Sequence, residues 1–173
     1  MHWRLPRAVF ERQKGAKNRA AMRRLVREGA EPGVLAYLRG EPVGWCAVAP
    51  REQYVRLERA RVLRRIDGAA VWSIVCLFVA ANRRRQGMSV GLIDGAAEFA
   101  AARGATIVEG YPVDAGTREM PPVFAWTGTA AAFLGAGFTE AARGSPARPI
   151  MRRHFARERV AAPRGHRSPQ PPR

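Results

Sequence analysis

The pattern of apolar and polar positions predicts strands and helices that alternate along one chain. Residues 71–79 are β-branched, aromatic or otherwise apolar without polar alternation, which is typical of a strand buried on both faces. Apolar residues then recur at helical spacing over residues 92–100, and Arg103-Gly104 provides a stop. Residues 80–89, rich in arginine, join the two. The sequence therefore predicts a strand, a basic turn and a helix in that order.

Other segments extend this pattern on both sides. Residues 33–38 and 43–48 are apolar and flank a short polar turn, which predicts a hairpin. Further elements are predicted as a strand over 106–111, a short helix over 130–138 that Gly137 ends in the left-handed conformation, and a last hairpin from 138–142 to 150–153. Together the segments predict a single domain of mixed α/β structure.

The basic turn has the features of a phosphate-binding loop. The first backbone N–H groups of a helix have no intrahelical partner, and the helix dipole adds positive charge at the same end. Gly87 lets a diphosphate approach the backbone, while Arg84 and Arg85 add charge-assisted hydrogen bonds, and Arg83 is interpreted as a solvated charge. Neither G-x-x-x-x-G-K-[ST] nor G-x-G-x-x-G after a strand is present. The residues expected to contact the anion are Arg84, Arg85, Gln86, Gly87, Met88, Ser89 and Val90.

This turn resembles motif A of the GNAT superfamily of acyl-CoA-dependent N-acyltransferases, [QR]-x-x-G-x-[GA]. Arg84, Gly87 and Ser89 stand at its three specified positions, with Ser89 where Gly or Ala is usual. The order of predicted elements over about residues 17–153 also resembles that superfamily. The resemblance implies an α/β (α+β) fold with a mixed, mostly antiparallel sheet flanked by helices, and a domain over residues 17–155. It also implies acetyl-CoA as co-substrate, with main-chain groups near Phe78 and Val79 holding its pantetheine arm.

The chain departs from the superfamily pattern in two places. A strand and a helix usually precede the region of residues 17–28, and only residues 1–16 are present there, so this N-terminal segment is interpreted as short or truncated. The superfamily often has a tyrosine that protonates the departing CoA thiolate, and Phe133 stands at that position. A thiolate with a pKa of about 8.5 leaves tolerably without an acid, so this change need not abolish activity.

A proton acceptor would help the reaction, because a lysine-like amine with a pKa of about 10.4 is mostly charged at neutral pH. Glu109 lies in a predicted strand among apolar residues, where desolvation makes a carboxylate more basic. The alternative is a structural carboxylate paired with an arginine. Tyr111 lies on the same strand face and could act as an acid or hold a water, or be a buried tyrosine satisfied by the backbone. Both residues are catalytic candidates.

Aromatic residues supply the candidate acceptor pocket, although aromatics in strands are commonly core residues. The candidates are Trp45, Tyr54, Trp72 and Trp126. Cys46 and Cys76 fall in predicted buried strands and are interpreted as small hydrophobic residues. None of the three histidines lies near another ligand in sequence, so a metal site is not expected.

Composition and charge narrow the class of protein. No apolar run is long enough to span a bilayer and residues 1–16 lack an apolar core, so we expect a cytoplasmic protein without a membrane segment. The net charge of +16 is concentrated at the ends, with nine basic and two acidic residues in 1–30 and seven and one in 152–173. Residues 161–173 predict a disordered basic tail rich in Pro and Arg. The 28 arginines against two lysines are typical of coding bias in a GC-rich, bacterial genome.

These observations lead to one hypothesis and two alternatives. The hypothesis is an N-acetyltransferase that moves an acetyl group from acetyl-CoA to an amine by direct attack in a ternary complex. One alternative is a catalytically silent GNAT-like protein that binds acyl-CoA or a partner. The other is a basic nucleic-acid-binding protein, which the absence of RNA-binding aromatic motifs and zinc fingers disfavours. The identity of the amine and the formation of a homodimer stay open.

Overall fold

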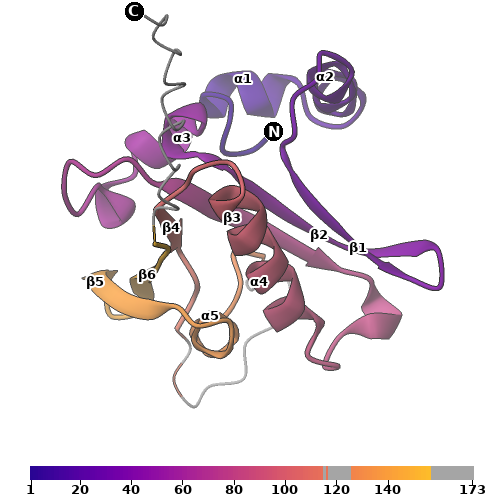
Figure 1. Cartoon of the computed structure of the whole chain (residues 1–173). Helices are drawn as coiled ribbons and strands as arrows, with labels where there is room; N and C mark the ends of the chain where they lie inside the picture. The colour runs from indigo at the N-terminus through magenta and orange to yellow at the C-terminus, as the bar shows by residue number, and fades with distance from the viewer. Residues whose placement is uncertain (115, 117–125, 157–173) are drawn as a thin grey trace, which may run out of the picture.

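The computed structural model describes residues 1–114, 116 and 126–156. Within these residues six strands form one sheet in the order β1-β2-β3-β4-β6-β5 (Figure 1). The strands are β1 (Gly33–Leu38), β2 (Glu41–Pro50), β3 (Trp72–Val79), β4 (Ile107–Gly110), β5 (Thr139–Ser145) and β6 (Arg148–His154). Strands β3 and β4 are parallel, and every other neighbouring pair is antiparallel. The predicted mixed, mostly antiparallel sheet is confirmed.

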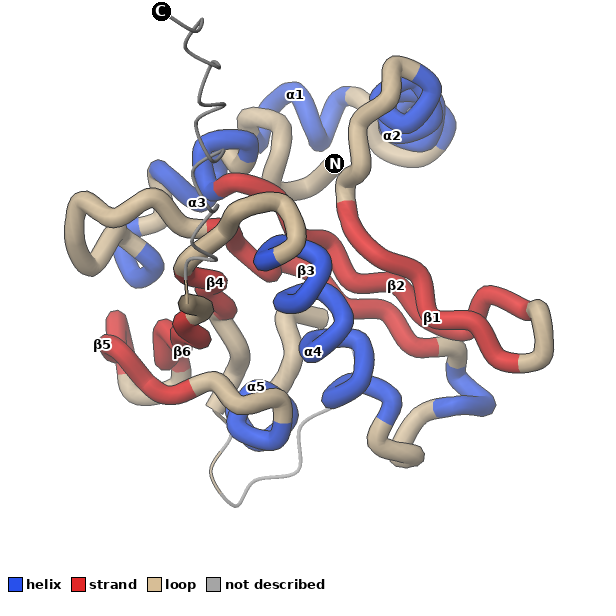
Figure 2. Tube along the Cα trace, viewed as in Figure 1, coloured by secondary structure: helices blue, strands red, loops and turns tan. Residues whose placement is uncertain are grey.

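Helices cover both faces of this sheet (Figures 1 and 2). They are α1 (Arg7–Arg12), α2 (Ala16–Arg27), α3 (Val55–Glu58), α4 (Met88–Ala101) and α5 (Ala130–Gly135). Helix α4 crosses β1, β2 and β3 on one face, with α5 beside it. The segment before β1, with α1 and α2, lies on the other side. Gly137 has a φ of 78° two residues beyond α5, so it has the left-handed conformation predicted from the sequence.

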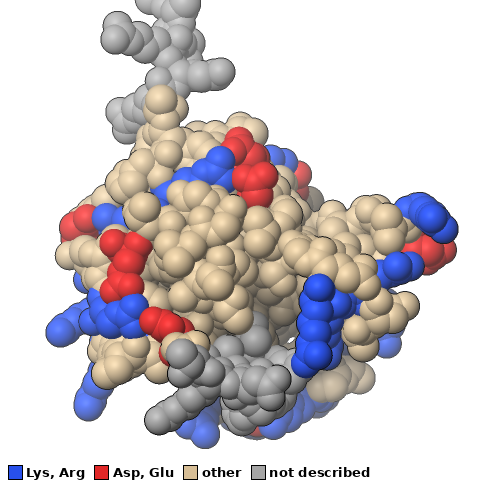
Figure 3. Space-filling model, turned by 90° about the horizontal axis from the view of Figure 1, so that it is seen from below, with Lys and Arg blue, Asp and Glu red and all other residues tan. Residues whose placement is uncertain are grey.

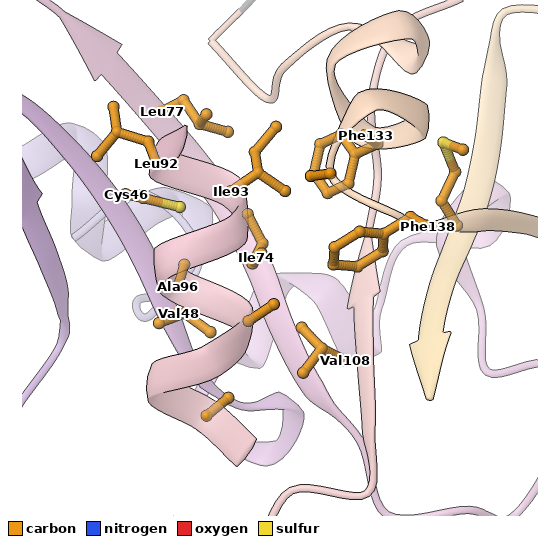
Figure 4. Close-up of a cluster of buried hydrophobic side chains, with 14 of the residues drawn as sticks. Cys46, Val48, Ile74, Leu77, Leu92, Ile93, Ala96, Val108, Phe133 and Phe138 are labelled. Carbon is orange, nitrogen blue, oxygen red and sulfur yellow. The ribbon is translucent and has the colours of Figure 1, made fainter. Parts of the chain in front are cut away.

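The larger hydrophobic core lies between α4 and the sheet (Figure 4). Leu92, Ile93 and Ala96 of α4 point onto Cys46 and Ile74 of the strands. The alanines on the buried side of α4 let the helix approach the sheet closely, because they add little volume between the two layers. This packing fixes the beginning of α4 against the end of β3.

A second, smaller cluster occupies the opposite face of the sheet. Its buried members are Ala49, Tyr54, Leu57, Leu63, Val75, Tyr111 and Ile150, and Trp3 packs against them. A side chain from the third position of the chain therefore contributes to the packing on this face. Residues 1–16 hold α1 and this contact, where the sequence indicated only a short leading segment.

A β-bulge interrupts the pairing of β2 with β3. Ala47 is opposite Cys76 and Val48 is opposite Ile74, so Val75 is an extra residue in β3. Both Val75 and Cys76 consequently belong to the cluster opposite α4. β4 pairs with β3 only as far as Ile74, which lies opposite Gly110. Beyond the bulge, β3 continues toward α4 without β4 beside it.

The expectation that residues 71–79 are buried on both faces is wrong for part of this strand. The side chain of Phe78 is 56% exposed, and Cys76 is only half-buried. Both lie in the portion of β3 that extends beyond its pairing with β4. A strand that has lost one neighbour leaves side chains and main-chain groups open at that edge.

Arginines of the fold form many ion pairs with acidic side chains. Arg153 contacts Asp94 and Glu98 of α4, and Arg143 contacts Asp114 and Glu140. On the face drawn in Figure 3, basic side chains lie toward the margins with acidic ones among them, and uncharged surface fills the centre. The predicted tail over 161–173 lies outside the described residues.

In the part of the chain that the structure describes, no helix combines the length and apolar character needed to cross a bilayer. The same residues contain no group of three or more His, Cys, Asp or Glu side chains arranged to hold a metal ion.

Candidate active site

The site begins where β3 leads into α4. Gly87 is the residue before α4 and has the left-handed conformation, with a φ of 75°. Arg85 also has a positive φ, 60°, which a residue with a side chain rarely adopts. Among the described residues, none of the backbone N–H groups of residues 85–89 donates to a backbone or side-chain acceptor. These five consecutive donors, at the positive end of the α4 dipole, therefore have no partner in the described part of the chain.

The side chains of this turn surround those donors. Arg84, Arg85 and Gln86 are exposed. Arg84 Nε donates to the carbonyl oxygen of Val79 at 3.1 Å, and Gln86 Nε2 donates to the carbonyl oxygen of Asn82 at 3.3 Å. An anion at the turn would meet backbone donors and two guanidinium groups, which suits a phosphate or diphosphate.

Two tryptophans form hydrogen bonds with main-chain groups at the edge of β3 that β4 does not pair with. Trp3 Nε1 donates to the carbonyl oxygen of Val75 at 2.9 Å. The backbone N–H of Leu77 donates to the carbonyl oxygen of Trp126 at 2.7 Å. Phe78 is opposite Trp45 of β2, on the other edge of the strand. At this edge the carbonyl oxygens of Val75 and Val79 and the N–H of Leu77 each have an internal partner.

A cavity of about 460 Å³ lies against the bulge, on the face of the sheet opposite α4. Its volume falls in the range typical of small-molecule sites. The lining residues are Met1, His2, Trp3, Arg4, Met22, Pro32, Trp45, Ala47, Tyr54, Val75, Cys76 and Trp126. The ring of His2 makes edge contacts with Trp3 and Trp126, whose own centroids are 5.7 Å apart.

The structure brings together three of the four aromatic residues predicted for an acceptor pocket. Trp45, Tyr54 and Trp126 line this cavity. Trp72 instead lies on the α4 face, where its ring is 6.3 Å from that of Phe99. Cys76 lines the cavity too, and burial raises the pKa of its thiol, so it is poorly suited to act as a nucleophile.

Tyr54 carries a buried polar atom without a partner. The residue is 1% exposed, and its hydroxyl makes no hydrogen bond with any described group. The Arg4 guanidinium lies over its ring, 4.9 Å from the centroid. Burial raises the pKa of Tyr54, so the hydroxyl is a neutral group that can donate and accept.

Glu109 and Tyr111, the two catalytic candidates, lie in a buried ion network. The hydroxyl of Tyr111 donates to Glu109 Oε2 at 2.6 Å, so the two share a strand face as predicted. Arg51 is completely buried, and its Nη1 contacts Glu109 Oε2 at 3.2 Å and Tyr111 Oη at 2.8 Å. Burial, followed by the charge of Glu109, raises the pKa of Tyr111. Ser73 completes the network through its hydroxyl, 2.8 Å from that of Tyr111.

The second carboxylate oxygen of Glu109 is also engaged. Arg152 Nε donates to Glu109 Oε1 at 2.8 Å, and the same guanidinium binds both oxygens of Asp67. The hydrogen bonds from Arg152 lower the pKa of Asp67 to about 2. Neither Glu109 nor Tyr111 lines the cavity. The arrangement matches the alternative interpretation of Glu109 as a paired structural carboxylate.

Phe133 lies in the core on the α4 face. It is fully buried, and its ring packs edge-on against Phe138 at 5.0 Å. The ring also fills the space where Gly110 would carry a Cβ atom. This position holds an apolar ring between α5 and β4.

Several residues of the site gave no local signal in the sequence. Arg51 is one of 28 arginines, and Trp3 and Arg4 lie before the first predicted element. Their roles come from contacts across 49 to 72 positions of the chain, such as Trp3 to Val75 and Arg4 to Gln53. Of these three residues, only Trp3, an unusual tryptophan near the start of the chain, could have pointed to the cavity.

Comparisons with known proteins bear on the family and the fold rather than on the geometry of the site. The sequence profile described as "Acetyltransferase (GNAT) family" matches residues 1–118. A search of the curated proteins finds no match. Among solved structures, a GNAT-family protein from Desulfovibrio desulfuricans is 16% identical with a TM-score of 0.52, covering 79% of this chain and 78% of its own. The ribosomal-protein-alanine N-acetyltransferase of Brucella melitensis is 17% identical with a TM-score of 0.50, covering 80% and 76%. At this identity the likeness concerns the fold.

Proposed function

The chain belongs to the GNAT acetyltransferase family, and on that premise we propose that it transfers an acetyl group from acetyl-CoA to an amine by direct attack in a ternary complex. The observation that carries this proposal is the set of five N–H donors over residues 85–89, which have no partner among the described residues and lie where β3 extends past β4. Anions bind at such helix ends, and ligands of α/β sheets commonly bind beyond the carboxyl ends of parallel strands where neighbours diverge.

Each part of acetyl-CoA has a matching feature. The diphosphate would accept hydrogen bonds from the turn and from Arg84 and Arg85. The pantetheine arm carries amide groups that can pair with a strand edge, and β3 presents main-chain groups at Val75, Leu77 and Val79. The partners that those groups now have, Trp3, Trp126 and Arg84, must release them when the arm binds. The thioester would then lie beside the bulge and the cavity.

The reaction needs no enzyme nucleophile. The neutral amine nitrogen attacks the thioester carbonyl carbon, a C–N bond forms, and the C–S bond breaks as the thiolate leaves. The amine loses one proton to water, and the thiolate takes up one. A backbone N–H of β3 supports the tetrahedral oxyanion, because a fixed donor stabilises charge that develops in the transition state.

Glu109 has no free lone pair directed at this site. Both its oxygens bind guanidinium groups, and Tyr111 donates to one of them. Among the described residues that line the cavity there is no aspartate or glutamate. We therefore assign Glu109 and Tyr111 to the support of the sheet, and we assign proton removal to solvent or to an amine that arrives neutral.

A pair of glycine variants tests the binding site. Gly87 and Gly104 lie near opposite ends of α4, both have positive φ, 75° and 85°, and a Cβ at either would meet no atom within 4 Å. Valine imposes similar backbone strain at both positions. Gly87→Val should lose acetyl-CoA affinity at least tenfold in calorimetry, whereas Gly104→Val should keep it. Equal affinities in the two variants would remove the proposed phosphate site.

The catalytic half of the proposal requires a second measurement. A protein that binds acetyl-CoA but releases no CoA thiol with any of a panel of primary amines would be a silent member of the family. Thiol release that depends on both acetyl-CoA and the amine, and that Gly87→Val lowers, supports transfer. This measurement separates the two alternatives that share the fold.

A further inference from the structure

The residues that line the cavity bear on which kind of amine it could bind. It is formed mainly by apolar side chains, with Trp3, Trp45 and Trp126 contributing indole rings and Met22 a flexible thioether. The bulge at Val75 sets this wall against the edge of β3 that β4 does not pair with. A ligand in the cavity would lie next to the strand that we propose holds the thioester.

The charged groups of the cavity are of one sign. Of the described residues lining it, Arg4 and the amino group of Met1 carry positive charge and His2 can gain one, while none is acidic. Arg4 is held by Gln53, with Nη1 donating to Oε1 at 2.6 Å, and Arg56 contacts His2 at 3.0 Å. A cationic amine would therefore lose water and find only positive charges among the described lining residues. An amine that enters uncharged avoids this penalty.

One polar atom of a residue that lines the cavity has no partner among the described residues. The hydroxyl of Tyr54 is buried and unpaired among the described residues, and such a group costs about 1 to 3 kcal/mol unless a ligand or water satisfies it. A phenol can donate to a neutral amine nitrogen or accept from its N–H. The hydroxyl is closed to solvent in the ligand-free protein, so an amine in the pocket reaches it once the Arg4 side chain over the Tyr54 ring moves.

We infer that this cavity binds a hydrophobic, weakly basic primary amine in its uncharged form, with the amine hydrogen-bonded to Tyr54; the inference rests on the proposed acetyl transfer. The common biological form of such an amine is an α-amino group next to a carbonyl and an apolar side chain. Its pKa of about 7.7 to 8.0 leaves roughly a tenth of it neutral at pH 7, several hundred times more than a lysine-type amine with a pKa of about 10.4. The adjacent carbonyl oxygen can accept from Arg4.

The test compares three amines: phenylalaninamide, the dipeptide phenylalanylglycine, and the basic diamine cadaverine. With acetyl-CoA saturating, phenylalaninamide should give a kcat/KM for CoA release at least tenfold above that of cadaverine. A comparable value for the dipeptide indicates that peptide N-termini are the source of the amine, and a much lower value indicates a small molecule. A preference for cadaverine would overturn the inference and leave the proposed transfer intact.

Tyr54→Phe gives a readout that a structural role would not produce. Removing the hydroxyl should weaken phenylalaninamide binding about fivefold in calorimetry, corresponding to about 1 kcal/mol for one hydrogen bond. The melting temperature should stay equal or rise, since an unpaired buried group is lost. Tyr37→Phe is the matched control, because Tyr37 is 61% exposed on β1. Unchanged binding in Tyr54→Phe contradicts the assignment, whereas lost binding with no CoA release from any amine upholds the site and refutes transfer.

A negative charge introduced into the wall tests how the cavity selects between amines. Met22→Glu places a carboxylate beside the cavity and should raise the cadaverine to phenylalaninamide ratio of kcat/KM at least fivefold over Met22→Gln, which has similar size without charge. Equal ratios in the two variants would show that the charge of the wall does not select the acceptor.

Discussion

The indole N–H of Trp3 donates a 2.9 Å hydrogen bond to the carbonyl oxygen of Val75. Val75 is the extra residue of the β3 bulge, at the point where β4 no longer accompanies the strand. The contact joins the start of the chain to the strand edge that the pantetheine arm would use. Trp3 and the arm would therefore compete for the same carbonyl oxygen.

Trp3→Phe is predicted to strengthen acetyl-CoA binding. The variant keeps an aromatic ring in the cavity and loses the donor, so the strand edge is freed at the cost of about 1 kcal/mol in the ligand-free protein. Affinity measured by calorimetry should increase about fivefold. Trp45→Phe is the control, since Trp45 lines the same cavity without such a contact to β3. If both variants bind acetyl-CoA as tightly as the wild type, the arm does not use the carbonyl oxygen of Val75.

Glu109→Gln is predicted to lower stability more than chemistry. The change weakens contacts of Arg51 and Arg152 with a buried carboxylate, which costs about 3 kcal/mol when one partner of a buried pair is removed. For a domain of this size the melting temperature should fall roughly 6 to 12 °C. Glu58→Gln, at the more exposed partner of the same Arg51, should have a smaller effect.

A large loss of turnover without a loss of stability would instead support Glu109 as a proton acceptor. A base at this position predicts turnover about 10²- to 10⁴-fold lower in the Gln variant, with acetyl-CoA affinity and melting temperature preserved. Turnover and melting temperature measured on the same preparation distinguish the two interpretations.

Phe133→Tyr is predicted to destabilise the protein without accelerating thiol release. The ring is fully buried against Gly110 and Phe138, so an added hydroxyl enters an apolar core and costs about 1 to 3 kcal/mol. Phe78→Tyr, on an exposed side chain of β3, should melt like the wild type. Faster CoA release in Phe133→Tyr with an unchanged melting temperature would mean that this position reaches the leaving thiolate.

Local sequence patterns were sufficient for most of the fold. The hairpin of residues 33–48 and the helical pattern over residues 92–100 follow from periodicity, glycine placement and turn chemistry, all of which act over a few residues. The position of Gly87 before α4 follows from the same signals. These features predicted the turn at Gly87 and the order of the elements along the chain, whereas the mixed, mostly antiparallel sheet was implied by the family resemblance.

The cavity could not be predicted in the same way. Whether Trp72 or Val75 faces it depends on the bulge, and a bulge is a property of how β2 and β3 pair. The burial of Arg51 depends on Glu58, Glu109 and the carbonyl of Leu63 meeting in space. Hydrophobic periodicity describes one segment at a time, so it predicts neither the bulge nor the burial of Arg51.

The stability of the protein should depend on pH through His2, whose ring contacts those of Trp3 and Trp126. Burial, and next the charge of Arg56, lower the pKa of His2 below its ordinary value of 6.5. His2 therefore binds a proton more readily in the unfolded chain than in the folded protein. The free energy of unfolding should decrease as the pH falls from neutral through 6.5, and it should level off below the pKa of His2 in the folded protein. Denaturant unfolding at a series of pH values measures this slope.

His2→Phe keeps a ring against Trp3 and Trp126 and should flatten the slope, whereas His154→Gln, at an exposed histidine, should leave it unchanged. A slope that persists in His2→Phe would assign the pH dependence to other groups and would show that this histidine is not protonated on unfolding.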